Sequence, residues 1–196
     1  MPKNNKRILI ILGHSGDKSL SKAMAEAYLR GAQESGAETR LLCLGELNFE
    51  PVLKEGYQGK QALEPDLLAA QQSMLWAEHL VFVYPVWWGA MPALLKGFID
   101  RTFLPGFAFK YRKNSVWWDR LLAGRSARLI TLMDTPPWYF RWVYRMPGHN
   151  QMKRTILEFC GIKPVHISGF GPIRTSSEQQ RKHWLAQSYA LGVKQK

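Results

Sequence analysis

Short apolar runs that alternate with segments of helical periodicity are the feature that most restricts how this chain can fold. Five runs rich in apolar and β-branched residues occupy residues 7–12, 38–44, 79–84, 126–133 and 163–170. Apolar residues at three- and four-residue spacing, together with capping residues and prolines at helix starts, predict helices over residues 20–34, 64–78, 92–103, 150–159 and 177–192. This alternation predicts a parallel sheet, because each right-handed crossover places a helix on a face of the sheet.

The number of strands narrows the architecture further. Five parallel strands suit the flavodoxin-like order 2-1-3-4-5, a three-layer α/β sandwich with helices on both faces of the sheet. With 196 residues, of which 46% are hydrophobic and 21% charged, the chain is expected to form one domain over residues 1–196. Two segments stand outside the alternation: residues 48–63, and an aromatic and basic insert at residues 104–124.

The formal net charge of +12 calls for an anionic partner to be considered. A basic surface can bind nucleic acid, an acidic membrane surface or the phosphates of a dinucleotide, and it can equally be a solvated surface with no partner. No recognised nucleic-acid motif is present, so we expect no nucleic-acid partner. No apolar run approaches the roughly 20 residues of a membrane-spanning helix, so we expect no integral membrane segment.

Cysteine usage and the amino-terminal sequence bear on the compartment. Cys43 and Cys160 are isolated, without the spacing of a metal site or of a disulfide framework, so we expect no metal and a reducing cytoplasm. The apolar run near the N-terminus is shorter than the roughly 7–15 residues of a secretory signal. We therefore expect a cytoplasmic protein.

Three loops should meet at the ligand-binding edge of the sheet. In the order 2-1-3-4-5, ligands bind beyond the carboxyl ends of the strands, near the point between the first and third strands where the order reverses. The loops that follow the first, third and fourth strands read GHSGDKSLS, PVWWGAM and DTPPWYF. We therefore expect the functional site to be built from these loops.

The first loop has the composition of a phosphate site. It is small and hydroxyl-bearing, it contains Ser19 and Ser21, and it ends at a helix N-terminus whose free amides favour anions. An ordinary serine-capped turn would look the same, and neither nucleotide-binding glycine motif is present. His14 in this loop is either a general acid or base, or a hydrogen-bonding spacer.

The second and third loops are aromatic. Trp87 and Trp88 suit a planar heteroaromatic ligand, although a tryptophan pair that anchors the following helix is the alternative. The third loop again combines polar and aromatic side chains, namely Asp134, Thr135, Trp138 and Tyr139. A phosphate loop beside two aromatic loops is the pattern of a flavin mononucleotide (FMN) site.

Two stretches resemble a known family. GHSGDKSLSKAM resembles the H-S-x-x-x-S-(F/L)-N-x-A loop of the NAD(P)H:quinone oxidoreductases of the flavodoxin-like superfamily. The longer stretch YPVWWGAMPALLKGFIDRTFLPGFAFKY is similar to that family's P-x-x-W-(W/F)-x-x-P-A-x-L-K-G motif with a following G-F-A-Y. The order and spacing of the elements agree over residues 7–171.

The resemblance implies a role for individual positions. The positions at which the family holds the flavin phosphate and ribityl chain are here His14, Ser19, Leu20 and Ser21. Those that hold the isoalloxazine ring are Pro85, Val86, Trp87, Trp88 and Gly89. Aromatic positions on the substrate side of the flavin, which in that family commonly come from the neighbouring subunit, are Phe109 and Tyr111.

Two departures from the family pattern affect this site. Ser21 replaces the usual asparagine, which changes one ribityl or phosphate contact. The family's T-T-G-G loop is here DTPPWYF, in which Pro136 and Pro137 offer no amide donors. His149 lies near a family position at which a histidine assists proton balance, and it is the one candidate catalytic residue.

The resemblance implies an enzyme, a flavin-dependent NAD(P)H dehydrogenase of the quinone type. Such an enzyme transfers a hydride from NAD(P)H to bound flavin and then passes two electrons to a quinone-like acceptor. We expect FMN, with FAD as an alternative, and a homodimer bridged by the 104–124 insert. The alternative is a flavin-binding electron carrier, or an ancillary regulatory subunit of an ion-efflux system, with little turnover of its own.

Overall fold

A computed structural model describes residues 5–16, 18–56, 59 and 61–195, and contains the predicted parallel sheet. Its strands are β1 (Arg7–Leu12), β2 (Glu38–Cys43), β3 (His79–Pro85), β6 (Ser126–Leu132) and β7 (Val165–Phe170). They pair in the order β2-β1-β3-β6-β7, with every pair parallel. The expected order 2-1-3-4-5 of the main strands is thus confirmed.

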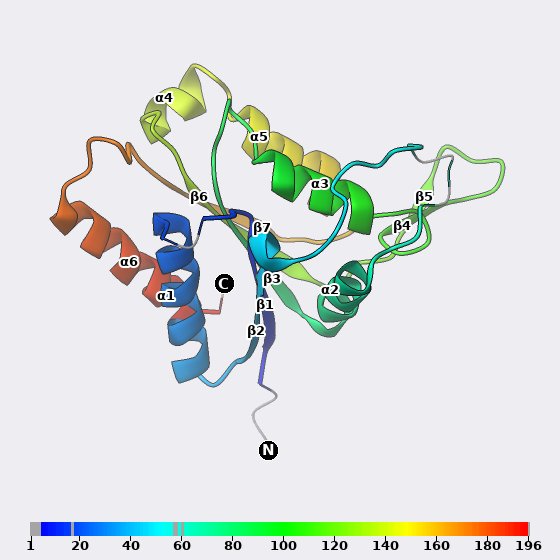
Figure 1. Ribbon diagram of the computed structural model, residues 1–196, viewed down its shortest axis with the longest axis horizontal. Helices are drawn as coiled ribbons and strands as arrows, with labels where there is room; N and C mark the ends of the chain where they lie inside the picture. The colour runs from blue at the N-terminus through cyan, green and yellow to red at the C-terminus, as the bar shows by residue number, and fades with distance from the viewer. Residues whose placement is uncertain (1–4, 17, 57–58, 60, 196) are drawn as a thin grey trace.

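Helices cover both faces of this sheet (Figure 1). On one face lie α1 (Leu20–Glu34) and α6 (Glu178–Val193), packed against each other. On the other lie α2 (Pro65–Trp76), α3 (Ala93–Thr102) and a long helix made of α5 (Pro147–Asn150) and η2 (Gln151–Glu158), the second part wound as a π-helix. Successive side chains of β1 point to opposite faces of the sheet, so this strand contributes to both halves of the core. Leu9 and Ile11 pack on the α2–α3 side, and Ile8 and Ile10 pack on the α1–α6 side.

The predicted element boundaries needed small corrections. The strand predicted over 38–44 ends at Cys43, because Leu44 begins the short 3₁₀ turn η1 (Leu44–Glu46). The helix predicted over 150–159 begins three residues earlier, at Pro147, a position at which a proline loses no hydrogen bond. The last helix begins as expected after Ser177, whose side chain forms a capping box with Gln180.

The 104–124 insert contains two strands that the sequence analysis missed. β4 (Phe109–Tyr111) and β5 (Trp118–Arg120) form an antiparallel hairpin that projects beside α2 (Figure 1). Trp118 stacks on Phe159 with ring centroids 4.4 Å apart and donates a hydrogen bond from Nε1 to the carbonyl of Phe159 at 2.9 Å. The hairpin is therefore held against the end of η2.

The 48–63 segment is held to α3 by one buried side chain. Arg101 is fully buried and donates Nη2 hydrogen bonds to a Glu64 carboxylate oxygen at 2.9 Å and to the Ala62 carbonyl at 2.8 Å. It also donates from Nη1 to the carbonyl of Glu50. One guanidinium thus bridges both ends of the segment, of which residues 57, 58 and 60 lie outside the described part of the chain.

No helix within the described residues is both long and apolar enough to cross a membrane.

Candidate functional site

The second of the two tryptophans that follow β3 lies in a two-residue turn, and the first lies directly before it. Trp87 and Ala90 exchange both backbone hydrogen bonds, each at 2.9 Å. The two residues between them, Trp88 and Gly89, have φ values of 51° and 77°. Two left-handed residues in succession form the tight turn that suits glycine or asparagine, and a tryptophan in it costs about 1 kcal/mol. The turn leaves the Trp88 side chain fully exposed beyond the sheet.

A cavity of about 540 Å³ lies beside this turn, at the carboxyl ends of β3 and β6. The turn contributes Val86, Trp88 and Gly89, and the segment after β6 contributes Asp134 and Thr135. The remaining lining residues are Phe140, Tyr144 and Pro147. Five of the predicted site residues are therefore brought together at the edge of the sheet at which the strand order located a site. We call this cavity the switch-edge pocket.

The third loop folds into a short helix that the sequence analysis did not predict. α4 (Pro137–Trp142) begins at the double proline, with Pro136 as N-cap and Pro137 in the first turn, where the missing N–H groups leave no bond unmade. Asp134 accepts a hydrogen bond from the amide of Arg174 at 2.8 Å, which fixes the start of the loop. Trp138 and Tyr139, predicted as cofactor contacts, do not line the switch-edge pocket, and Phe140 of the same helix does.

The first loop ends at a capped helix N-terminus. Ser19 caps α1 by accepting a hydrogen bond from the amide of Lys22 at 3.2 Å, and Leu20 and Ser21 form the first turn. Ser21 is buried, and Leu20 is half-buried against the α1–α6 side of the core. His14 accepts a hydrogen bond at Nδ1 from the amide of Gly16 at 2.9 Å, which makes it a brace of the loop. Residue 17 lies outside the described part of the chain.

Trp87 connects the first loop to the second. Its ring meets the imidazole of His14 edge-on, with centroids 5.7 Å apart. Trp87 is half exposed and does not line the switch-edge pocket, in contrast to Trp88. Pro85 is the last residue of β3, directly before Val86. The loop predicted to bind phosphate and the loop predicted to hold the ring are therefore in contact through the side chains of His14 and Trp87.

His149 lies beneath the site and not at its surface. It is 4% exposed, its Nε2 is 2.9 Å from the hydroxyl oxygen of Thr131, and its Nδ1 has no partner among the described residues. Phe140, which lines the switch-edge pocket, packs edge-on against the imidazole at 4.9 Å. Burial lowers the pKa of His149 from 6.5 to about 4, which keeps the ring neutral at pH 7.

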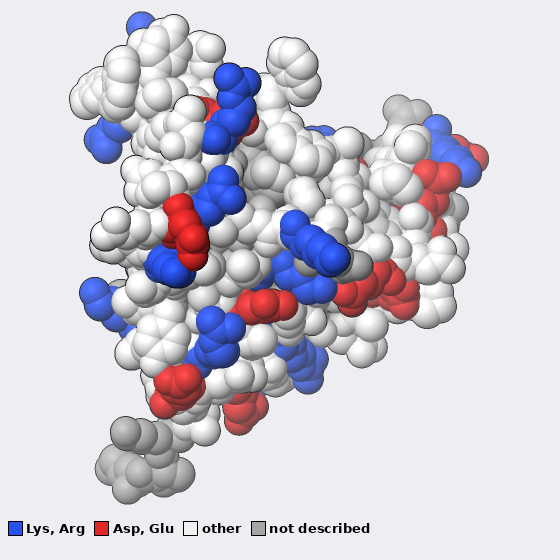
Figure 2. All heavy atoms as spheres, turned by 60° about the vertical axis from the view of Figure 1, so that its left-hand side comes forward, with Lys and Arg blue, Asp and Glu red and all other residues white. Residues whose placement is uncertain are grey.

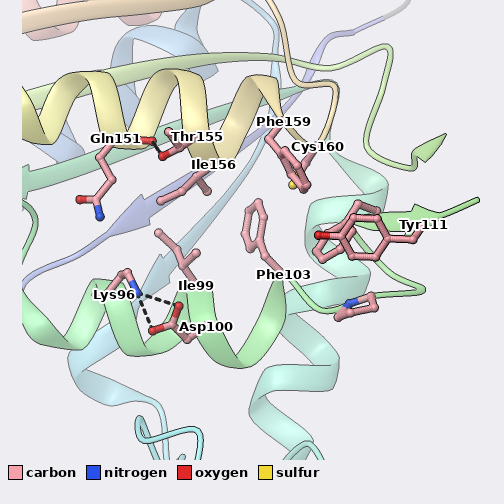
Figure 3. Close-up of a pocket in the computed structure, with 12 residues that line it drawn as sticks. Lys96, Ile99, Asp100, Phe103, Tyr111, Gln151, Thr155, Ile156, Phe159 and Cys160 are labelled. Carbon is pink, nitrogen blue, oxygen red and sulfur yellow. Dashed lines mark hydrogen bonds and ion pairs between the residues drawn. The ribbon is translucent and has the colours of Figure 1, made fainter. Parts of the chain in front are cut away.

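Phe109 and Tyr111 line a different cavity, of about 480 Å³, between α3 and η2 (Figure 3). Its walls include Phe103, Ile156 and Phe159, and its rim carries the ion pair between Lys96 and Asp100, at 2.7 Å. Within one chain, these two aromatic residues are therefore not brought to the switch-edge pocket. Tyr111 is 62% exposed, and its ring packs edge-on against that of Phe109 with centroids 5.3 Å apart.

Three lining residues of the switch-edge pocket were missed from the sequence: Phe140, Tyr144 and Pro147. Phe140 comes from α4 and Tyr144 from just after it. The chain then folds back through Arg145 and Met146, with φ values of 58° and 53°, and so brings in Pro147. The amide of Gly148 then donates to the carbonyl of Gly89 at 2.8 Å, which holds the start of α5 against the tryptophan turn. The single sequence signal was the Pro147–Gly148 pair.

The described residues contain no cluster of histidine, cysteine and carboxylate side chains that could hold a metal ion. The lining of the switch-edge pocket offers aromatic rings and the polar residues Asp134 and Thr135. Cys160, whose thiol pKa is raised to about 12 by burial, lines the other cavity. The site is therefore suited to binding a flat organic ligand and supplies no activated nucleophile of its own.

Comparison with known proteins gives a family over most of the chain. Residues 6–190 match a family described as having a flavodoxin-like fold. A ribosyldihydronicotinamide dehydrogenase [quinone] of Rattus norvegicus is 29% identical, and the alignment covers 92% of this chain and 88% of the relative. An uncharacterized NAD(P)H oxidoreductase of Haemophilus influenzae is also 29% identical, with coverage of 89% and 88%.

The solved structures agree. The crystal structure of Smu.1420 from Streptococcus mutans UA159 is 29% identical in sequence and superposes with a TM-score of 0.84, covering 96% of this chain and 99% of that one. The strand order, the family match and the solved structure all indicate a protein with a flavodoxin-like fold.

Proposed function

Because the chain belongs to the family of proteins with a flavodoxin-like fold, we propose that it is a flavin-dependent NAD(P)H oxidoreductase. Its homologues are NAD(P)H dehydrogenase (quinone) enzymes. In the proposed reaction, NAD(P)H gives up two electrons and a proton, and a quinone-like acceptor takes up two electrons and two protons, the second from water. The acceptor and the choice between NADH and NADPH belong to the proposal.

The switch-edge pocket is the observation that carries this proposal. It combines about 540 Å³ of space with the aromatic side chains Trp88, Phe140 and Tyr144, at the carboxyl ends of two parallel strands. A flat ring system fits between such walls, and polar groups at Asp134 and Thr135 can fix its orientation. The residues present therefore fit an isoalloxazine ring.

The N-terminus of α1 is suited to bind the phosphate end of the cofactor. Its free amides and dipole favour a phosphate, Ser19 holds the turn, and Trp87 joins this loop to the ring side of the site through His14. This division supports FMN, which carries one phosphate at the end of a short chain. Bound flavin supplies hydride acceptor and donor chemistry, and the protein supplies orientation and charge.

We propose that His149 acts as a positioning residue. It contacts Thr131 on β6 and Phe140 on the pocket wall, so it holds the wall of the switch-edge pocket at a fixed distance from the sheet. Its buried position and lowered pKa argue against proton exchange with the ligand by way of solvent in this conformation.

We further propose that the protein works as a homodimer in which the hairpin of one chain completes the pocket of the other. Phe109 and Tyr111 line a cavity apart from the switch-edge pocket of their own chain, and Tyr111 is exposed, as a residue contributed to a partner would be. Light scattering during size-exclusion chromatography checks the mass, and a monomeric protein with full turnover would contradict this arrangement.

The visible absorption spectrum of the purified protein, followed by identification of the released cofactor, is the test of the main proposal. We expect a yellow protein that releases FMN, that is bleached by NADH or NADPH without oxygen, and that regains its colour when a quinone is added. A colourless protein that takes up neither FMN nor FAD would rule out a flavoprotein. Slow bleaching with no quinone turnover would favour the electron carrier or regulatory subunit.

A further inference from the structure

The segment from α4 to the start of α5 carries large apolar side chains that the fold leaves uncovered. Trp138 and Trp142 are 64% and 71% exposed, and Val143 and Tyr144 are about half exposed. Phe140 is buried and anchors the helix, so the exposure of its neighbours follows from how α4 is seated. Large apolar side chains that cluster on a surface mark an interaction site more often than scattered ones do.

Two exposed aromatic side chains near this segment belong to the switch-edge pocket and are counted separately from the surface of α4. Tyr144 and Trp88 both line the switch-edge pocket, and Trp88 is fully exposed. We call the surface made by the exposed side chains of Trp138, Trp142 and Val143 the α4 patch. In Figure 1, α4 lies at the top corner of the molecule, beyond the end of the sheet.

Arginines are interleaved with these apolar residues. Arg141 and Arg145 are exposed, and the Arg141 guanidinium lies 5.3 Å from the centre of the Trp142 ring. Residues 135–157 contain no aspartate or glutamate, and their cations are Arg141, Arg145, Lys153 and Arg154. In Figure 2 the upper end of the molecule, where α4 lies, is largely white, with blue groups around it and some red beside the blue just below.

Tryptophan, tyrosine and arginine in one exposed segment suit the headgroup region of a bilayer. Tryptophan and tyrosine rings prefer this region because one end is apolar and the other polar, and arginines beside them are attracted to anionic lipids. α4 has only 6 residues, so it would lie on the surface. The proposed homodimer uses the β4–β5 hairpin, and a second copy seated on α4 itself fits less well, because a twofold contact there would bring the like charges of Arg141 and Arg145 close to those of the other copy.

We propose that the α4 patch docks this protein on the surface of bilayers that contain anionic lipid. The docking surface does not depend on the proposed enzymatic function. If that function holds as well, docking brings the enzyme to a quinone dissolved in the lipid.

Sedimentation with vesicles tests the docking. Vesicles of phosphatidylcholine alone are compared with vesicles of phosphatidylcholine mixed with phosphatidylglycerol, using the full-length protein. We expect binding to the mixed vesicles that weakens with salt, and roughly tenfold or greater weakening in the double variant Trp142→Ser with Val143→Ser. The double variant Arg141→Glu with Arg145→Glu should lose the preference for the anionic lipid.

Matched controls separate the patch from the overall charge. Trp117→Ser removes an exposed tryptophan from the tip of the β4–β5 hairpin, and Arg30→Glu with Lys163→Glu changes the net charge equally at exposed positions away from α4. These controls should keep most of the binding, and circular dichroism confirms that each variant folds. Absence of binding to the mixed vesicles, equal losses in the controls, or self-association that depends on Trp142 would each overturn the proposal.

Discussion

Burial keeps the imidazoles of two histidines neutral, and this links the stability of the fold to pH. Burial lowers the pKa of His149 to about 4 and is the largest cause that lowers the pKa of His79 to about 3. His79 is fully buried, with its Nδ1 2.8 Å from the hydroxyl oxygen of Ser126. In the unfolded chain both rings take up a proton near pH 6.5, so below that pH the unfolded state binds more protons than the folded state.

We therefore predict that the free energy of unfolding falls as the pH drops from 7.5 to 5.5. Each histidine should contribute a loss of about 1.4 kcal/mol over this range, and the loss continues until the pH reaches the folded pKa. Urea unfolding at both pH values measures it. In His149→Gln, which does not titrate, the loss should be smaller by about 1.4 kcal/mol. An unchanged pH dependence in that variant would show that His149 is protonated in the folded state.

Gly148 is the residue at which the tryptophan turn and α5 approach most closely. A Cβ atom added there would lie 2.4 Å from the carbonyl oxygen of Gly89 and 2.7 Å from the Cα of Ala90. Both neighbours are backbone atoms, so they cannot move aside as a flexible side chain would.

We predict that Gly148→Ala shifts the turn, lowers stability by about 1–3 kcal/mol and weakens flavin binding. Urea unfolding and fluorescence titration with FMN measure the two effects. Arg154→Ala, an exposed substitution further along the same long helix, serves as the control and should change neither. Normal flavin binding in Gly148→Ala would show that the position of the turn is not critical for the site.

Among the elements, the 48–63 segment depends most on a single contact. The Arg101 side chain is 0% exposed and pairs with Glu64, whereas the Arg112 side chain is 59% exposed and pairs with Asp119 at 2.8 Å. The two pairs have similar lengths, so burial is the main difference between them. Loss of the buried Arg101 guanidinium leaves the partly exposed Glu64 carboxylate and two backbone carbonyls without their bonds.

We predict that Arg101→Met lowers the free energy of unfolding by about 3–5 kcal/mol. Arg112→Met should lower it by less than about 1 kcal/mol, because water already screens that pair. Urea denaturation of both variants makes the comparison. Equal effects would mean that burial does not set the strength of these pairs.

The sequence predicted the main elements of this fold well and its short elements poorly. The five parallel strands are long and apolar, and their pattern does not depend on distant residues. β4 and β5 have 3 residues each, too few to show a period, and they are held by contacts such as Trp118 on Phe159. α4 begins with two prolines, which predict a loop, and its place depends on Phe140 being buried.

The residues of the candidate site also divide into those that the sequence pattern predicted and those that depend on tertiary contacts. Val86, Trp88, Gly89, Asp134 and Thr135 were found because they follow parallel strands, and the strand order fixes where such loops meet. Tyr144 and Pro147 come from a segment whose path turns through two left-handed residues, and neither glycine nor asparagine marks that turn in the sequence. His149 was identified as a candidate, but its depth beneath Phe140 follows from tertiary packing alone.

For the whole molecule, the proposed cofactor should act as a stabiliser. A ligand that binds only the folded state adds about 2.7 kcal/mol at a hundred times its Kd, which corresponds to a rise in Tm of about 5–10 °C for a chain of this size. We predict this rise when FMN is added to flavin-free protein, with a thermal scan as the measurement.

Riboflavin, which lacks the phosphate, should raise Tm less than FMN at equal concentration. In Ser19→Ala the difference between the two ligands should shrink, because the cap that orders the N-terminus of α1 is lost. A Tm that responds to neither FMN nor FAD would argue against a flavin site in this protein.

The tryptophan turn has an optical consequence. Trp88 is fully exposed, so its indole relaxes in water and emits at the long-wavelength end of tryptophan fluorescence, within reach of dissolved quenchers. Flavins absorb light in the same wavelength range, and an indole at the pocket wall would lie within a few ångströms of one. Excitation energy would then pass to the flavin without emission. Flavin bound in the switch-edge pocket would therefore be detected as a loss of tryptophan fluorescence at long wavelengths, without any attached label.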